Sequence, residues 1–237
     1  ALCADANRNA SITMRMKLTG DSGNQALKPR INADIIMNQL AREQFHLDFE
    51  AALAFATRLH AGQVRNKTDI PYISHLIGVA GLVLEYGGNR DEAIAALLHD
   101  AIEDQAAGYV GGATQLRADI RTQFGHKVLC IVEGCTDSET LPKPPWKQRK
   151  QHYIDHVCAV DDSTRLVSCA DKLHNARAIV SDLRVFGDAL FDRFGGGKGG
   201  TLWYYRSLAD TFLELGNRRI AEELDRTVQE MERLAQA

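Results

Sequence analysis

The sequence predicts an all-α protein, and three observations support this class. Apolar residues recur at three- and four-residue steps along most of the chain from Leu47 onward, which is the spacing that places them on one face of an α-helix. No run of useful length alternates apolar and polar residues as a half-buried β-strand does. Clusters of glycine and proline divide the helical stretches from one another.

Residues 1–45 differ from the rest, and we treat them as an N-terminal tail in front of one domain at residues 46–237. The segment up to Leu40 is polar, rich in asparagine and interrupted by glycine and proline. Met14 and Met16 are candidate natural starts. We therefore expect the tail to be disordered in part, or to derive in part from outside the natural chain.

The first three expected helices each carry an apolar stripe. In the first, apolar residues repeat over Leu47–Leu59, and a loop follows at Gly62–Pro71. In the second, the stripe over Leu76–Leu84 stops at Gly87-Gly88, since glycine commonly ends helices. The third is expected to continue without a break from about Arg90 to Gln105.

The second half of the domain is expected to add six more helices. A glycine-rich turn precedes two short ones at Thr114–Phe124 and His126–Cys135. Prolines then interrupt the chain, a helix resumes near Trp146, and a long helix follows at about Asp162–Leu183. We interpret the run Gly195–Gly200 as a flexible link into two last helices.

Composition and charge exclude several classes of protein. The chain has 28 basic and 31 acidic side chains and a net charge of −3, whereas a general nucleic-acid binder needs a basic excess. No apolar run approaches the ~20 residues of a membrane span, and the N-terminus lacks the apolar core of a signal peptide. Five cysteines without a Cys-x-x-Cys pair indicate free thiols in a reducing cytosol. We expect a cytoplasmic protein that binds neither nucleic acid nor membrane, and its oligomeric state is left open.

The segment AALLHDAIEDQ, residues 95–105, carries a polar cluster within apolar sequence. On one continuous helix His99 and Glu103 share a face, and Asp100 and Asp104 lie ~100° around from it. Burying three carboxylates and an imidazole together is costly unless a cation holds them. A solvated helix end is the alternative, but the flanking leucines and isoleucine favour burial, so the segment predicts a divalent metal site.

Two further polar residues in apolar surroundings complete this metal site. His75 lies in PYISHLIGVA, and Asp171 lies in VSCADKLHNARAIV. With His99 and Asp100 they supply two imidazole nitrogens and two carboxylates, a donor set that suits Mn²⁺ or Fe²⁺ and, less readily, Zn²⁺. His174, three residues after Asp171, is expected only to pack between helices.

Glu103 and Asp104 exceed what the metal needs. They lie one turn beyond His99 and Asp100, where they could orient or deprotonate the attacking water. This surplus of carboxylates distinguishes a hydrolase from a protein that only binds a metal.

At these residues the sequence resembles the HD phosphohydrolase superfamily, because His75, the pair His99-Asp100 and Asp171 match its H…HD…D signature. A longer likeness is to the hydrolase domain of RelA/SpoT proteins and to the small alarmone hydrolases, including the metazoan SpoT homologue. It rests on HAGQVRNK, PYISH, AALLHDAIED, the pattern at 124–136 and ADKLHNAR, and it covers roughly residues 47–205. The resemblance implies a bundle of about ten helices that binds one Mn²⁺ and removes the 3′-pyrophosphate of (p)ppGpp.

The resemblance also implies contacts to a small phosphorylated nucleotide. Arg65 resembles the residue that stacks on the purine, and a guanidinium suits stacking and charge neutralisation. Lys143 in TLPKPP matches a lysine that contacts phosphate. Asn175 could reach the substrate from one turn after the metal-binding aspartate, and Lys198 and Tyr204 are weaker candidates for the distal phosphate.

Three departures from the family pattern leave the base preference open. Asn66 replaces a basic residue, Gln105 replaces a threonine, and Ala178 replaces another threonine. The adenine analogue (p)ppApp and the 2′-phosphate of NADPH are alternative substrates. From a different class, the chain could be a nucleotide-binding regulator without turnover, although retention of all the polar candidates argues against that reading.

Overall fold

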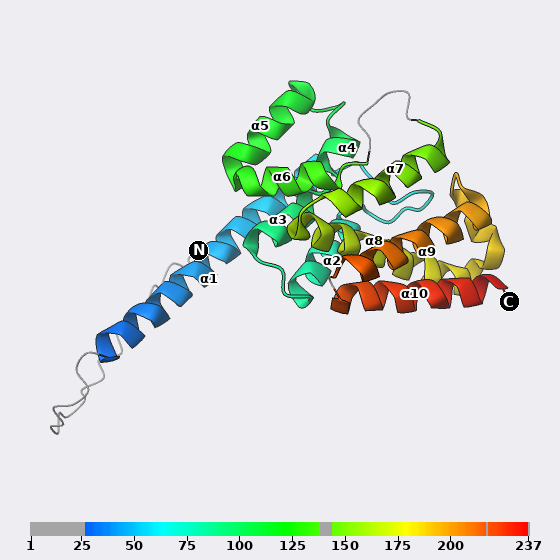
Figure 1. The fold of residues 1–237 in the computed structure, drawn as a ribbon. Coiled ribbons are helices and arrows are strands. Elements are labelled where there is room, and N and C mark those ends of the chain that lie inside the picture. The colour runs from blue at the N-terminus through cyan, green and yellow to red at the C-terminus, as the bar shows by residue number, and fades with distance from the viewer. Residues whose placement is uncertain (1–26, 138–143, 217, 237) are drawn as a thin grey trace, which may run out of the picture. The chain divides into compact units, whose positions relative to one another are not determined.

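The computed structural model describes residues 27–137, 144–216 and 218–236. These ranges contain ten α-helices and one 3₁₀ helix, and they contain no strand, only an isolated antiparallel bridge between Val64 and Pro71 (Figure 1). The all-α prediction is therefore confirmed. None of the helices in the described ranges combines the length and the hydropathy that a membrane span requires. Most of the expected N-terminal tail, residues 1–26, lies outside the described residues.

Helix α1 extends from Leu27 to Leu59 and so begins earlier than the helical pattern predicted. Pro29 lies in its first turn, where proline costs no intrahelical hydrogen bond, and no glycine or proline follows before Leu59. The chain divides into two compact units, residues 1–43 and 44–237. All the candidate site residues belong to the second unit.

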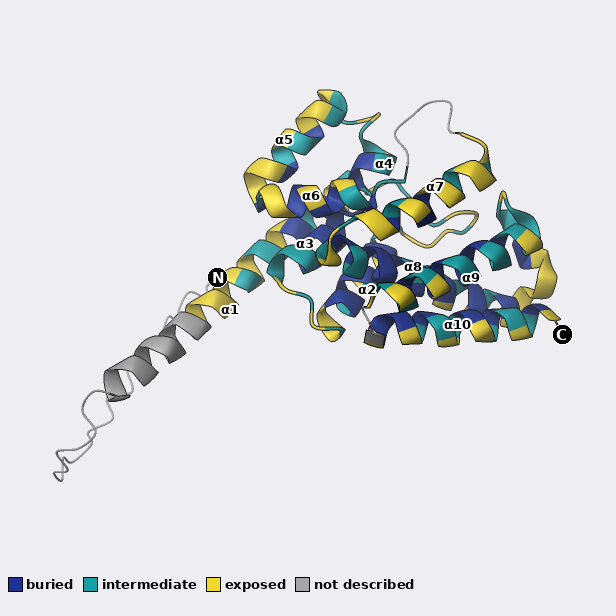
Figure 2. Ribbon diagram, viewed as in Figure 1, coloured by how far each residue is buried: buried dark blue, intermediate teal, exposed yellow. Residues whose placement is uncertain are grey.

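The second unit is built around one long helix, α8. The helices after α1 are α2 (Ile73–Glu85), α3 (Arg90–Leu98), α4 (Ala101–Gln105), α5 (Gly112–Phe124), α6 (His126–Cys135), α7 (Trp146–Ala159), α8 (Asp162–Phe186), the 3₁₀ helix η1 (Gly187–Arg193), α9 (Gly197–Leu215) and α10 (Arg218–Gln236). Helix α8 packs against α2, α3, α6, α9 and α10, and α8, α9 and α10 lie side by side in Figure 1. Buried positions are concentrated on α2, α3 and α8 (Figure 2).

The helix expected at Arg90–Gln105 is interrupted at His99 and Asp100, between α3 and α4. The His99 ring donates from Nδ1 to the Ala96 carbonyl oxygen over 2.8 Å. This carbonyl oxygen therefore accepts from a side chain. Asp100 has φ −95° and ψ 2°, outside the α-helical region. The prediction that His99 and Glu103 share a face of one straight helix was therefore wrong.

The run Gly195–Gly200 is not a free link, because α9 begins within it and the Trp146 indole packs on it. A Cβ atom at Gly196 would lie 2.5 Å from the indole, and one at Gly200 would lie 3.1 Å away. Glycine is a poor helix former, but here its missing side chain makes room for the ring. Trp146 is the first residue of α7, so this contact fixes the start of α7 against α9.

Candidate metal centre and substrate cavities

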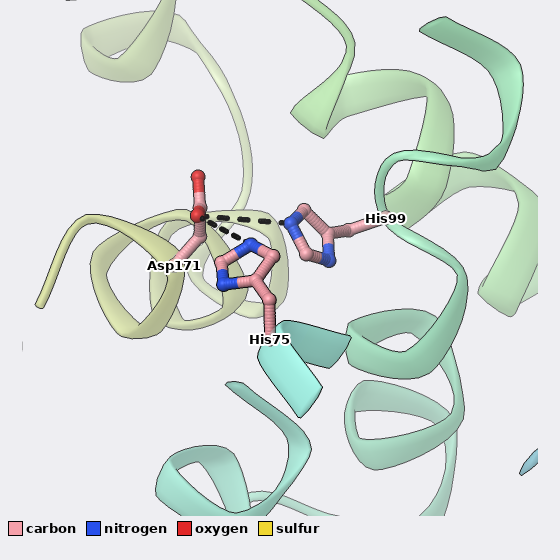
Figure 3. Close-up of side chains that lie close together, drawn as sticks. All are labelled: His75, His99 and Asp171. Atoms are coloured by element: carbon pink, nitrogen blue, oxygen red, sulfur yellow. Dashed lines mark ion pairs between the residues drawn. The ribbon is translucent and has the colours of Figure 1, made fainter. Parts of the chain in front are cut away.

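Three buried side chains from three parts of the chain converge. His75 lies on α2, His99 lies between α3 and α4, and Asp171 lies on α8 (Figure 3). One potential ligand atom from each lies within 4.8 Å of the others. Asp171 Oδ1 is 3.2 Å from His75 Nε2 and 3.7 Å from His99 Nε2. Asp100 Oδ2 lies 2.9 Å and 3.6 Å from the Nε2 atoms of His99 and His75, so both carboxylates predicted from the sequence face both imidazoles.

The orientation of His99 fits a metal ligand. Its Nδ1 donates to a backbone carbonyl, which leaves Nε2 of the neutral ring with a lone pair. That Nε2 atom is buried and has no hydrogen-bond partner within the described part of the chain. Although Asp100 Oδ2 is close, its direction is not that of a hydrogen bond. A lone pair that faces carboxylate oxygens requires a positive charge nearby, and a divalent cation supplies it.

The charges of the cluster also suit a cation. Burial alone would lower the pKa of His99, but the carboxylates of Asp100 and Asp171 raise it well above its ordinary value. Burial would raise the pKa of Asp171, but Lys172, His75 and His99 hold it well below its ordinary value. Without a metal, a proton on the imidazole therefore balances the carboxylates.

His174 does more than pack between helices, which is the role expected from the sequence. Its Nδ1 lies 2.9 Å from His75 Nδ1. Burial, together with the nearby His75 and Arg65, lowers the pKa of His174 to about 4, so its ring is neutral at neutral pH. The Nε2 atom of His75 faces the carboxylates, so its Nδ1–H donates a hydrogen bond to His174 Nδ1. Metal-binding histidines commonly donate their second ring N–H to an outer partner in this way. Gly78 makes room for this ring, because a Cβ atom there would lie 2.2 Å from His174 Nε2.

Outer partners also orient both carboxylates of the cluster. The Tyr72 hydroxyl donates to Asp100 Oδ2 over 2.6 Å. Lys172 Nζ donates to Asp171 Oδ2 over 2.6 Å, and Asn175 Nδ2 donates to Asp171 Oδ1 over 2.5 Å. Tyr72 and Lys172 were not recognised from the sequence, although each lies beside a motif residue.

Glu103 and Asp104 lie on the short helix α4, directly after the break. Glu103 Oε2 accepts from the Asp137 backbone N–H over 3.1 Å, and Asp104 Oδ2 accepts from Gln63 Nε2 over 2.7 Å. Gln105, the second departure from the family pattern, contacts the same Gln63 side chain. It therefore lies beside the carboxylates and not beside the cavity that contains Asn66 and Ala178.

Two adjoining cavities open beside Asn175. The first, which we call the Arg65 cavity, has a volume of about 440 Å³. Its walls include Arg65, Asn66, Tyr72, Ala178 and Phe194. Arg65 Nη2 donates to Asn175 Oδ1 over 2.8 Å. Arg65 and Asn175, both predicted substrate contacts, thus form a chain of two hydrogen bonds that ends at the Asp171 carboxylate.

The second cavity, which we call the Arg149 cavity, has a volume of about 330 Å³ and shares Asn175 with the first. Its walls include Arg149, Lys150, Lys172, Thr201 and Tyr204. A larger cavity of about 680 Å³ lies between α1, α4 and α5 and contains none of the candidate site residues.

The walls of the Arg149 cavity carry buried hydrogen-bond donors and two neighbouring cations. Thr201 and Tyr204 are 3% and 5% exposed, and their hydroxyls, like Arg149 Nε, have no hydrogen-bond partner among the described residues. Buried donors of this kind are costly unless a ligand pairs with them. Arg149 and Lys150 both contact the one Asp137 carboxylate, so one of their two positive charges is not offset by it. Of these residues only Tyr204 was predicted from the sequence.

The two lysines predicted to contact phosphate stand differently. Lys198 Nζ donates to Asp188 Oδ2 over 2.6 Å, and Lys198 lines neither of the two cavities. Lys143 lies outside the described residues.

Comparisons with known proteins show which family the chain resembles. The model of the HD domain family matches residues 52–187. A Xenopus tropicalis protein named guanosine-3′,5′-bis(diphosphate) 3′-pyrophosphohydrolase MESH1 is 38% identical over 129 residues, which are 53% of this chain and 66% of that protein. The Homo sapiens protein of the same name is 37% identical over 130 residues, with the same two shares. The match thus spans slightly less than two thirds of these relatives.

Solved structures show the same fold. One, described as a metazoan ortholog of SpoT that hydrolyzes ppGpp and plays a role in starvation responses, has a TM-score of 0.61 and 24% identity, and the match covers 77% of this chain and 94% of that chain. The crystal structure of lmo0812 from Listeria monocytogenes EGD-e has a TM-score of 0.56 and 26% identity, and the match covers 69% of this chain and 99% of that chain.

Proposed function

Because the chain belongs to the HD domain family, we propose that it is a metal-dependent phosphohydrolase that removes the 3′-pyrophosphate of a (p)ppGpp-type alarmone. The observation that carries the proposal is the junction at Asn175. This residue joins a buried imidazole–carboxylate cluster to a cavity where three buried donors have no hydrogen-bond partner among the described residues and where Arg149 and Lys150 share one carboxylate. The activity named in the Xenopus and human relatives supports the choice of substrate.

We assign the metal to His75, His99, Asp100 and Asp171. Two imidazoles with two carboxylates favour Mn²⁺, with Fe²⁺ and Zn²⁺ less expected. When bound, a divalent ion supplies Lewis acidity, which neutralises charge on the phosphate and strengthens water as a nucleophile at neutral pH. The outer partners of the four side chains keep their donor atoms directed at one point.

Glu103 and Asp104 are the proposed proton-transfer residues. A water oxygen attacks the phosphorus attached to the 3′-oxygen, and the bond between that phosphorus and the 3′-oxygen breaks. One of the two carboxylates accepts a proton from the water, and a proton is returned to the 3′-oxygen that leaves. The products are GDP or GTP and pyrophosphate. The hydrogen bonds from the Asp137 backbone N–H and from Gln63 orient these two carboxylates.

The two cavities divide the substrate between them. The Arg65 cavity would take the nucleoside, since its guanidinium can stack on a purine and its wall carries the apolar Phe194. The Arg149 cavity would take the phosphates, since Arg149 and Lys150 share the carboxylate of Asp137 and phosphate oxygens are strong acceptors for such charged donors. Asn66 and Ala178 both line the Arg65 cavity. Asn66 lacks the charge of the basic residue that it replaces, and Ala178 lacks the hydroxyl of the threonine that it replaces. We therefore expect weak selectivity between guanine and adenine.

The test is a product assay of the Mn²⁺-loaded protein with ppGpp, ppApp and NADPH, in which nucleotides, pyrophosphate and orthophosphate are separated by anion-exchange chromatography. We expect pyrophosphate and GDP from ppGpp, and a kcat/KM for ppApp within about tenfold, a gap of ~1.4 kcal/mol. Asp171→Asn is the control, because it removes one proposed ligand at nearly constant volume. Orthophosphate from NADPH with no release from either alarmone would contradict the proposal and indicate a phosphomonoesterase. Binding without any release would indicate a nucleotide-binding regulator.

A further inference from the structure

A short chain of side-chain amides reaches α4 from the loop that follows α1. Gln63 Nε2 donates to Asp104 Oδ2 over 2.7 Å. The oxygen of the same amide, Gln63 Oε1, accepts a hydrogen bond from Gln105 Nε2 and lies 2.6 Å from His60 Nδ1. The Gln63 amide is thus held at both of its ends.

This arrangement allows only one orientation of the Gln63 amide. Turning it round would place its oxygen against the Asp104 carboxylate and its NH₂ group against the NH₂ group of Gln105. Both contacts would be repulsive, because like groups would face each other. Since the amide oxygen can only accept, the 2.6 Å contact with His60 is a hydrogen bond when His60 Nδ1 carries the proton, and Gln105 Nε2 lies farther from that atom, at 3.3 Å.

The loop that carries Gln63 is itself well anchored. The Gln63 backbone N–H donates to the His60 carbonyl over 3.0 Å, and the Tyr72 N–H donates to the Gln63 carbonyl over 2.9 Å. His60 is 3% exposed and stacks on Tyr72, with 5.4 Å between the ring centroids. Because both backbone groups of Gln63 are bonded, the position from which its side chain reaches Asp104 is fixed.

We infer that Gln63 and Gln105 are a pair of positioning residues that fix the Asp104 carboxylate for proton transfer. Gln63 acts on the Asp104 carboxylate directly, and the Gln105 side chain supports Gln63 from its other end. The inference rests on the proposed function, in which Asp104 handles the proton. Neither glutamine lines the Arg65 cavity or the Arg149 cavity, so their effect falls on turnover and not on substrate binding.

The inference predicts a particular pattern in a double-mutant cycle. Gln63→Leu should lower kcat by about 10- to 100-fold, the usual cost of a misplaced reacting group. Gln105→Leu should lower kcat by roughly 2- to 10-fold, since it removes one hydrogen bond from the support. The double variant should be no slower than Gln63→Leu alone, because the Gln105 side chain contacts the amide of Gln63, which in turn binds the Asp104 carboxylate.

Two further readouts separate positioning from general damage. The KM for the nucleotide and the Mn²⁺ affinity, measured by titration calorimetry, should stay within about twofold of the unmodified protein. The matched control is Gln115→Leu, which breaks an amide–carboxylate hydrogen bond of 2.9 Å to Asp119 on α5 and should leave kcat unchanged.

If the losses in activation free energy for Gln63→Leu and Gln105→Leu add in the double variant, the inference is overturned. A near-normal kcat in Gln63→Leu would overturn it as well. A protein that hydrolyses no alarmone would instead overturn the proposed function. The contact is then tested by urea unfolding of Gln63→Leu, Asp104→Ala and the double variant. Midpoint shifts that do not add support the pairing of Gln63 with Asp104, and additive shifts contradict it.

Discussion

Gly78→Ala should weaken metal binding although it adds only one methyl group and touches no proposed ligand. The new Cβ atom would lie 2.2 Å from His174 Nε2, whereas ordinary contact begins at 3.4 Å. The His174 ring must therefore move by more than 1 Å, and its 2.9 Å contact with the His75 ring is lost. His75 then lacks the partner that holds its Nε2 atom toward the carboxylates.

The magnitude follows from two opposing terms and one coupled loss. Alanine gains about 1 kcal/mol over glycine in a helix, and the overpacked ring costs about 1–3 kcal/mol. The free energy of unfolding should therefore fall by no more than about 2 kcal/mol, which leaves the domain folded. Loss of an outer partner typically lowers metal affinity by about 10- to 100-fold, and this is the expected effect on Mn²⁺.

The assay is calorimetric titration of the metal-free variant with Mn²⁺, together with urea unfolding. Gly81→Ala on the same helix is the matched control, because nothing lies within 4 Å of a Cβ atom there. It should stabilise the protein by about 0.4–1 kcal/mol without changing Mn²⁺ affinity. His174→Ala should lose as much affinity as Gly78→Ala, and the combined variant should lose no more. Unchanged Mn²⁺ affinity in a folded Gly78→Ala protein would refute the reasoning.

Four further outcomes are expected. Glu103→Ala or Asp104→Ala should lower kcat by ~10²–10⁴ with Mn²⁺ affinity kept in calorimetry, and near-normal rates in both would require another proton acceptor. Mn²⁺ affinity should rise with pH, because the carboxylates beside His99 raise its pKa above the ordinary value despite burial and the bound proton must leave. In the metal-free protein the same raised pKa stabilises the fold below about pH 6.5, and urea unfolding should show this stability lost as pH rises further. Gly196→Ala should cost about 1–3 kcal/mol in urea unfolding because it meets the α7 indole at 2.5 Å, whereas Gly199→Ala meets nothing within 4 Å.

The sequence contained enough information for the helical class and for the residues of the metal cluster. Helical spacing of apolar residues reports which face is buried, and costly polar residues within such a face report a shared ligand. This reasoning led to His75, His99 and Asp171, which the fold places within 4.8 Å of one another.

Sequence reasoning was weaker wherever a side chain competes with the backbone or fills a space left by glycine. The break between α3 and α4 arises because the His99 ring takes the Ala96 carbonyl, a contact that leaves no periodic signal. The glycine run at the start of α9 has the composition of a linker, yet the Trp146 indole packs closely against it. Arg149 and Thr201 come together only because α7 and α9 pack in space, so nothing local in the sequence marks them as a pair.

The separation of the cluster residues along the chain has a consequence for how the domain comes apart. His75 and His99 are 24 positions apart, and His99 and Asp171 are 72 positions apart, so an ion held by all three acts as a cross-link that closes two long loops. A ligand that binds only the folded state at 100 times its Kd adds about 2.7 kcal/mol of stability. That gain is distributed unevenly: amide hydrogens of α2 and α8 should exchange more slowly in the loaded protein whenever opening releases the ion. Fraying at the end of α10, which holds no ligand, leaves the cross-link closed and should proceed at the same rate with or without metal.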